Sequence, residues 1–236
     1  MANFLYLSDV FCPWCYGFGP VLERLCAEHP DLPVRVLGGN LVPEPVSLAQ
    51  LQEDSPRLRD FFIRLEKTTG RPVSAFLRLL EHRPGLCLNS TAISLSLAAL
   101  KRLVPGQALP QMEAFQESLY GRGEDVLSRS VQHALAARWN VRAADFDQAL
   151  AQDATQEQAR CEAQEAAALM GELRLYPTLF LEQGQKRLLL ARGYVPYAMV
   201  KKALAAALAG TSDQAAQGRP GGPYDGIREG GQHSGR

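Results

Sequence analysis

Two cysteines separated by two residues, Cys12 and Cys15, are the part of this sequence best suited to chemistry. A pair with this spacing can form and reopen a disulfide bond, or it can supply half of a structural zinc site. A structural zinc ion takes four ligands, but Cys26, Cys87 and Cys161 stand alone and the 4 histidines form no closely spaced pair. The spacing therefore favours thiol–disulfide chemistry, and we expect no metal site.

The cysteine pair lies between a predicted strand and a predicted helix. Residues 3–8 are rich in strand formers, and after Cys15 apolar residues recur at helical spacing until Pro30. Pro13 suits the first turn of a helix. The unpaired N–H groups of a helix start stabilise a thiolate, so we expect Cys12 to be the exposed nucleophile, with a pKa below the free-thiol value of about 8.5. Cys15 is then the shielded cysteine that resolves the mixed disulfide.

Three neighbours of the pair have two interpretations each. Asp9 could relay protons to Cys15, or it could accept backbone N–H bonds in the turn that follows the strand, and we favour the second role. Phe11 and Trp14 could pack in the core, or they could form an exposed apolar rim for an unfolded or peptide substrate. We favour the rim.

The composition excludes several classes of partner. The 236 residues are 46% hydrophobic, and 25 basic residues balance 25 acidic ones. This balance predicts neither a nucleic acid nor an anionic membrane as a partner. No apolar run approaches the roughly 20 residues that span a bilayer. The N-terminus lacks the pattern of a signal peptide, so we expect a cytoplasmic protein.

The order of apolar patterns predicts a β–α–β start, a helical block and a β–β–α end. Within the block, Ser47 and Asn89 are predicted helix N-caps. Residues 211–236 are rich in Gly, Pro, Gln and Ser, which predicts a disordered tail. The remaining segments are a strand at 34–37, the helical block at 44–173, strands at 178–181 and 187–191, and a helix from Pro196 to Leu208.

These features together resemble the thioredoxin superfamily. The match rests on Cys12-Pro13-Trp14-Cys15 after the first strand, Tyr176-Pro177-Thr178 before the third, and Pro20 within the active-site helix. Within the superfamily, the sequence is similar to the DsbA-like family and its FrnE-like branch, over about residues 3–209. The resemblance implies an α/β protein: a thioredoxin fold with a large all-helical insertion between its second and third strands. The discontinuous thioredoxin domain would comprise residues 1–43 and 174–210, with the insertion at 44–173.

The resemblance also implies an activity and a set of site residues. The expected activity is that of a thiol–disulfide oxidoreductase, with Pro177 in a cis peptide beside the cysteines and an extended substrate pairing with the chain there. Trp14 replaces the histidine of strongly oxidising members, so oxidising power is not implied. The expected site comprises Cys12 and Cys15 as catalytic residues, Pro13, Trp14 and Asp9 as their support, and Tyr176, Pro177 and Thr178 for substrate binding.

No cofactor is expected, although glutathione could act as a redox partner. The expected partners are thiol or disulfide substrates, either proteins or small molecules, and the choice between monomer and homodimer stays open. One alternative is a glutathione-dependent enzyme of the kappa transferase or 2-hydroxychromene-2-carboxylate isomerase type. Those enzymes carry a serine at the position of Cys12 and lack the resolving cysteine. A second alternative is a redox-switched peptide-binding module. Cys161 shares a helix face with carboxylates, so we expect it to ionise poorly.

Overall fold

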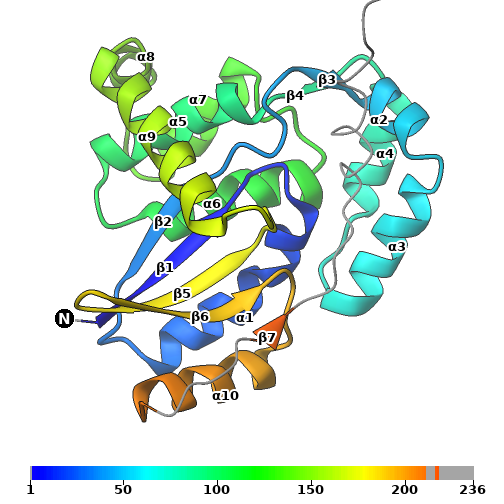
Figure 1. Ribbon diagram of the computed structural model, residues 1–236. Helices are drawn as coiled ribbons and strands as arrows, with labels where there is room; N and C mark the ends of the chain where they lie inside the picture. Colours follow the sequence, from blue (N-terminus) through cyan, green and yellow to red (C-terminus); the bar gives the residue numbers. More distant parts are fainter. Residues whose placement is uncertain (1, 211–215, 218–236) are drawn as a thin grey trace, which may run out of the picture.

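A mixed β-sheet forms the centre of the fold in the computed structural model, which describes residues 2–210 and 216–217 (Figure 1). β1 pairs in parallel with β2 and antiparallel with β5, β5 pairs antiparallel with β6, and β6 pairs in parallel with β7. β1 is central and is buried from Phe4 to Ser8, which agrees with its nearly continuous apolar sequence. The strand order is β2-β1-β5-β6-β7, with β1 at Ala2–Ser8, β2 at Val34–Gly38, β5 at Thr178–Gln183, β6 at Lys186–Arg192 and β7 at Ala216–Gln217.

Helices pack on both faces of this sheet (Figure 1). α1, at Pro13–Glu28, and α10, at Tyr197–Leu208, contact each other on one face. α9, at Asp153–Met170, contacts β2 on the other face. α6, at Ala108–Gln116, contacts both β2 and α1, so it joins the edge strand β2 to the helix that follows β1.

The chain between β2 and β5 is almost entirely helical, as the apolar periodicity predicts. The helix that begins at Ala108 continues into a π-helix, a form often found at functional sites. The division of the chain into a thioredoxin domain at residues 1–43 and 174–210 and an insertion at 44–173 stays a prediction. Besides α6 and α9, this segment contains α2 (Leu48–Asp54), α3 (Leu58–Thr69), α4 (Ser74–His82), α5 (Ser90–Leu103), the π-helix η1 (Glu117–Gly121), α7 (Arg129–Ala137) and α8 (Ala143–Leu150).

Both predicted helix caps are confirmed. The Ser47 hydroxyl accepts a hydrogen bond from the N–H of Gln50 at 3.1 Å, and the Asn89 side chain accepts one from the N–H of Ala92 at 2.8 Å. The block also contains a small antiparallel sheet that the sequence did not predict, formed by β3 (Val46–Ser47) and β4 (Cys87–Leu88). Strands of two residues are too short to carry a periodic signal.

The predicted disordered tail, residues 211–236, lies outside the described residues except for Ala216 and Gln217. These two residues form β7, beside Ala191 and Arg192 of β6.

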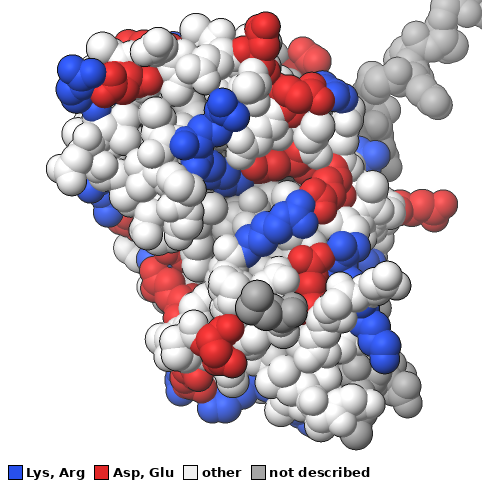
Figure 2. All heavy atoms as spheres, turned by 90° about the vertical axis from the view of Figure 1, so that its left-hand side faces the viewer, with Lys and Arg blue, Asp and Glu red and all other residues white. Residues whose placement is uncertain are grey.

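Charges of both signs are interspersed over the face in Figure 2, in keeping with the equal numbers of basic and acidic residues. Ion pairs between elements include Arg35 with Glu165 and Lys201 with Glu28. No helix in the described part of the chain has the length and apolar character needed to cross a bilayer.

Candidate active site

Cys12 and Cys15 lie at the N-terminus of α1, where the sequence predicts them. Cys12 is the N-cap residue, and its Sγ accepts a hydrogen bond from the N–H of Cys15 at 3.3 Å. The Cys12 carbonyl accepts bonds from the N–H groups of Cys15 at 3.1 Å and Tyr16 at 3.2 Å. Both cysteines are free thiols. The N-terminus of α1 thus provides an N–H donor to the Cys12 sulfur and places Cys15 within one helical turn of Cys12.

The expectation that Cys12 is exposed is wrong. Cys12 is 3% exposed and Cys15 is fully buried. Burial raises the pKa of Cys12 well above its usual value, with further increases from the Cys15 thiol and the Asp9 charge, while the Cys15 N–H opposes them. The expectation of a lowered pKa is therefore also wrong, because the free-energy cost of removing the thiolate from water exceeds the stabilisation that the helix N-terminus provides.

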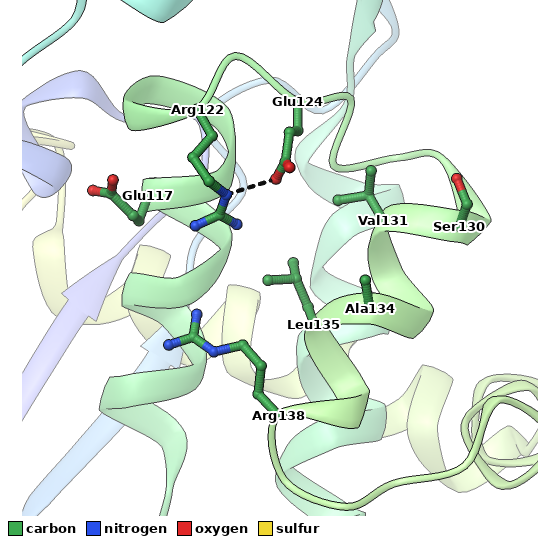
Figure 3. Close-up of a pocket in the computed structure, with 8 residues that line it drawn as sticks. All are labelled: Glu117, Arg122, Glu124, Ser130, Val131, Ala134, Leu135 and Arg138. Carbon is green, nitrogen blue, oxygen red and sulfur yellow. Dashed lines mark hydrogen bonds and ion pairs between the residues drawn. The ribbon is translucent and has the colours of Figure 1, made fainter.

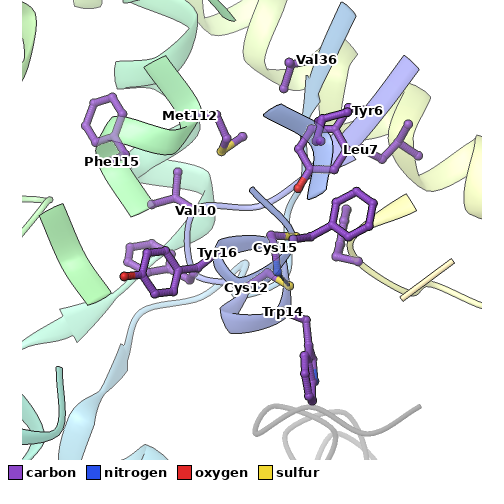
Figure 4. Packing of buried hydrophobic residues seen from close by; sticks show 14 of the residues in the cluster. Tyr6, Leu7, Val10, Cys12, Trp14, Cys15, Tyr16, Val36, Met112 and Phe115 are labelled. Carbon is purple, nitrogen blue, oxygen red and sulfur yellow. Dashed lines mark hydrogen bonds between the residues drawn. The ribbon is translucent and has the colours of Figure 1, made fainter. Parts of the chain in front are cut away.

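The aromatic neighbours are buried instead of forming an exposed rim. Phe11 is fully buried and Trp14 is 9% exposed. Trp14 packs edge-on against Phe61 of α3, with ring centroids 5.7 Å apart, and at the same separation against Tyr194 in the loop after β6. Figure 4 shows Trp14 extending from the same turn of α1 as the cysteines. The rim interpretation is wrong for both residues, and for Trp14 the reason is that aromatic side chains distant in the sequence cover it.

Asp9 is buried, and both of its carboxylate oxygens accept hydrogen bonds. Its Oδ1 accepts bonds from the Phe11 N–H at 2.8 Å and the Ser90 hydroxyl at 3.0 Å, and its Oδ2 accepts one from the Leu41 N–H at 2.9 Å. Its carbonyl also accepts a bond from the Cys12 N–H at 3.2 Å. Burial raises the pKa of Asp9, and these hydrogen bonds oppose that rise. The residue connects the cysteine turn to the loop after β2 and to α5.

Tyr176, Pro177 and Thr178 form the turn that enters β5, and the Tyr176–Pro177 peptide is cis. The Tyr176 hydroxyl accepts a hydrogen bond from the Asn40 N–H at 3.3 Å. Burial raises the pKa of Tyr176, and the charges of Asp9, Cys15 and Cys12 raise it further, so the Tyr176 side chain lies within electrostatic range of the cysteine pair. Thr178 is fully buried and its hydroxyl donates to the Leu175 carbonyl at 2.6 Å, so that side chain holds the turn together.

Tyr16, directly after Cys15, ties the helix start to the insertion. Its hydroxyl donates to the Pro72 carbonyl at 3.0 Å and lies 3.2 Å from Glu117 Oε2. Arg71 lies over the Tyr16 ring at 4.0 Å and donates to the same Glu117 oxygen at 2.9 Å. Burial raises the pKa of Tyr16 to about 12, so its hydroxyl stays protonated. The π-helix therefore presents its carboxylate to the active-site helix.

Sequence reasoning missed two polar residues, the buried Tyr6 of β1 and the half-buried Glu113 of α6. The sequence treats Tyr6 as one more strand former, and Glu113 lies among the polar residues of a predicted helix. Gly19 of α1 is no signal for Glu113, because a Cβ there would meet this side chain at an ordinary van der Waals distance. The Oε1 atom of Glu113 lies 3.6 Å from the position of a Cβ at Gly19.

Two surface cavities lie in or beside the insertion. One, of about 410 Å³, lies between η1 and α7, where Arg122 pairs with Glu124 at 2.9 Å (Figure 3). None of the expected site residues lines it. The other, of about 430 Å³, is lined by Asn40 and by residues of α5 and α9, including Thr91 and Arg160. Asn40 connects this second cavity to the turn that contains Tyr176.

The other cysteines lie apart from this site. Cys26 is half-buried, and burial raises its pKa to about 11. Cys87 and Cys161 are exposed. A hydrogen bond from Cys161 to Glu157 raises the thiol pKa, which confirms the expectation that it ionises poorly.

Comparison with known proteins identifies the family. Residues 6–205 match the DSBA-like thioredoxin domain, and the chain belongs to that family. The predicted fold class is confirmed: a thioredoxin fold with helices inserted between β2 and β5. A comparison with curated proteins gave no match.

Several solved structures share the fold. A Nitrosomonas europaea protein proposed to be a protein disulfide isomerase is 22% identical, with a TM-score of 0.77, over 89% of this chain and 98% of its own. The cytosolic disulfide reductase DsbM of Pseudomonas aeruginosa is 24% identical, with a TM-score of 0.71, over 88% and 98%, and its structure with GSH is also similar. A 2-hydroxychromene-2-carboxylate isomerase is 17% identical, with a TM-score of 0.60, over 89% and 100%.

Proposed function

We propose that this protein is a thiol–disulfide oxidoreductase that reduces disulfide substrates through Cys12 and Cys15. The observation that carries the proposal is the pair of free thiols at the start of α1, with Cys12 Sγ bonded to the Cys15 N–H. Membership of the DSBA-like family supports disulfide oxidoreductase activity in general. The sequence Cys12-Pro13-Trp14-Cys15 supplies the two sulfurs that such a reaction needs.

In the proposed reaction, the Cys12 thiolate attacks one sulfur of the substrate disulfide. A mixed disulfide forms, and the other substrate sulfur leaves as a thiolate that takes up a proton. Cys15 then loses its proton and attacks Cys12 Sγ, which breaks the bond to the substrate and releases the second thiol. The substrate gains two electrons and two protons, and the enzyme gains the Cys12–Cys15 disulfide.

The surroundings of Cys12 support the proposed reducing direction. Strong oxidants in this superfamily are oxidising because a stabilised thiolate favours their reduced form. Here burial raises the pKa of Cys12, and Cys15 and Asp9, the neighbours that act on its charge, carry no positive charge. The neighbouring Trp14 cannot supply one either. Without thiolate stabilisation at neutral pH, the couple lacks the property that makes a strong oxidant.

The turn that contains Tyr176 is the proposed docking place for the substrate. Among the described residues, no hydrogen bond engages the backbone N–H or C=O of Tyr176, and we assign both to pairing with an extended substrate chain. This pairing requires a local opening of the site, because Tyr176 is 8% exposed. The cavity of about 430 Å³ beside Asn40 adds polar side chains next to this turn. We propose glutathione as the thiol that returns the enzyme to its reduced form, in a cytoplasmic setting. The P. aeruginosa reductase of the same fold, which has a structure with GSH, supports this choice.

The test is reduction of a protein disulfide substrate such as insulin by the full-length protein, with measurement of the Cys12/Cys15 potential against glutathione. Cys12→Ser should abolish turnover, and Cys15→Ser should accumulate covalent complexes with substrate. Cys87→Ser and Cys161→Ser are matched controls that should keep the wild-type rate, because both residues are exposed and lie outside the site. Full turnover by Cys12→Ser would contradict the proposal.

The isomerase alternative can be distinguished from the proposed function by an assay with the substrate of that isomerase. The isomerase structure named above shares the fold, but this chain has a cysteine pair where that class uses a serine. Isomerisation of 2-hydroxychromene-2-carboxylate with glutathione, without disulfide reduction, would favour the alternative.

A further inference from the structure

The cavity of about 410 Å³ between η1 and α7 is lined by two arginines with unused hydrogen-bond donors. Arg122 donates from Nε to Glu124 at 2.9 Å, and its two terminal nitrogens have no partner in the described part of the chain. The guanidinium of Arg138 has no hydrogen bond or ion pair among the same residues, and it lies 5.6 Å from the centre of the Trp139 ring. Figure 3 shows both guanidinium groups pointing toward one another, from the end of η1 and the end of α7. Their free donors therefore converge on one part of the cavity.

The two carboxylates that line this cavity already have cationic partners. Glu124 pairs with Arg122, and Glu117 Oε2 accepts a hydrogen bond from Arg71 at 2.9 Å. Once these pairs are formed, the positive charge of Arg138 is left without a partner. The cavity thus has an excess of one positive charge, which suits a ligand that carries one negative group.

The wall beside the unpaired guanidinium is apolar. Val131, Ala134, Leu135 and Arg138 follow one another at intervals of three, one and three residues, so they share one face of α7. Leu135 is 2% exposed, Val131 is half-buried and Ala134 is exposed. All four line the cavity. A ligand held at Arg138 would therefore have its remaining atoms against an apolar strip.

The loop that carries Arg122 and Glu124 is held by its own backbone. Gly123 has a φ of 68°, and a Cβ there would lie 2.7 Å from the Ala75 carbonyl oxygen, so the loop packs closely on α4. The N–H of Glu124 donates to the Ser118 carbonyl at 2.9 Å, which fixes the loop to η1. A wall fixed in this way loses little conformational entropy when a ligand binds.

We propose that this cavity binds a small organic monocarboxylate with an apolar body. The carboxylate accepts hydrogen bonds from the terminal nitrogens of Arg122 and from Arg138, and the apolar body lies along Val131, Ala134 and Leu135. The volume is within the range of small-molecule sites. An ion pair at an exposed guanidinium is weak by itself, so the apolar contacts must supply part of the affinity. This inference is independent of the proposed thiol–disulfide exchange, because no residue of the cysteine site lines the cavity.

The experiment is isothermal titration calorimetry of the reduced full-length protein with three probes. The first is 4-phenylbutyrate, which has one carboxylate and an apolar body. The second is 4-phenylbutanamide, its uncharged counterpart, and the third is inorganic phosphate, an anion without an apolar body. We expect the carboxylate to bind at least about tenfold more tightly than either of the others. Equal affinity for the carboxylate and either other probe would overturn the proposal, as would the absence of saturable carboxylate binding at millimolar concentration.

Variants then locate the site. Arg138→Gln should weaken binding of 4-phenylbutyrate by about tenfold, and Ala134→Glu should weaken it at least as much, because it adds a like charge and fills the cavity. Arg129→Gln is the matched control, since this exposed arginine of α7 does not line the cavity and should keep the affinity within about twofold. Cys12→Ser should also keep it, so a failure of the proposed redox function leaves this test unaffected. Unchanged affinity in Arg138→Gln, or weakening by Arg160→Gln of the second cavity instead, would refute the assignment.

Discussion

The ammonium of Lys101 donates a hydrogen bond to the carboxylate of Glu162 at 2.5 Å, and both side chains are largely buried. Glu162 Oε2 also accepts a bond from the Gly38 N–H at 3.0 Å, and Lys101 donates to the Val36 carbonyl at 2.9 Å. This pair therefore joins α5 and α9 to the end of β2. Burial lowers the pKa of Lys101, and the charge of Glu162 and its hydrogen bond oppose that change.

Removing one member of this pair should destabilise the protein more than removing both. Glu162→Leu leaves the Lys101 charge buried without its partner and should lower the free energy of unfolding by about 3–5 kcal/mol. The double variant Lys101→Met/Glu162→Leu removes both charges and should recover part of that loss. Urea unfolding of the wild type and both variants checks this, and a double variant no more stable than Glu162→Leu would contradict it.

The reactivity of Cys12 should rise with pH well into the alkaline range. Its raised pKa means that the thiolate fraction increases about tenfold per pH unit up to that pKa. Trp14→His adds a hydrogen-bond donor and should move the alkylation profile to lower pH. Trp14→Phe loses similar packing against Phe61 and Tyr194 without adding a donor, so it should keep the wild-type profile. Mass-spectrometric measurement of Cys12 alkylation from pH 6 to 10 provides the test, and identical profiles for the two variants would refute the account.

Gly39→Ala should damage the proposed substrate turn. A Cβ at Gly39 would lie 2.5 Å from Cζ of the Tyr176 ring, so the ring or the strand end must move. We expect a lower melting temperature and a several-fold increase in KM for disulfide reduction. Gly85→Ala is the matched control, because a Cβ there meets no atom within 4 Å. Equal melting temperatures and KM values for the two variants would contradict this prediction.

Stability should fall as the pH rises from about 5 to 8, in part because of Glu113. Its pKa is about 8 in the folded protein and about 4.3 in an unfolded chain. Between these values the folded state binds more protons than the unfolded state, so the slope of unfolding free energy against pH is negative. Glu113→Gln should flatten this slope, whereas Glu53→Gln, on the exposed surface of α2, should not. Thermal unfolding across this pH range checks the sign, and the same slope in Glu113→Gln would contradict it.

The sequence predicts the elements of the fold well, because its signals are local. The cap residues Ser47 and Asn89 and the Cys12–Cys15 spacing each act within a few positions. What the sequence could not predict depends on contacts between distant segments. Trp14 is buried by Phe61 and Tyr194, 47 and 180 positions away by the numbering, and no periodic pattern reports such contacts. The prediction for the pKa of Cys12 was wrong for the same reason, because that pKa depends mainly on burial and burial depends on distant segments.

The contacts of Tyr16 restrict how the site can open. Its hydroxyl is held by the Pro72 carbonyl and by Glu117 of the π-helix, and Arg71 covers its ring. A swing of the whole insertion away from α1 would break all of these contacts at once. Trp14 is covered more locally, by Phe61 of α3 and by Tyr194, whose hydroxyl donates to the Thr68 carbonyl at 3.4 Å. A local movement of α3 or of the Tyr194 loop would uncover Trp14, beside the cysteine pair, while Tyr16 keeps its contacts with the insertion.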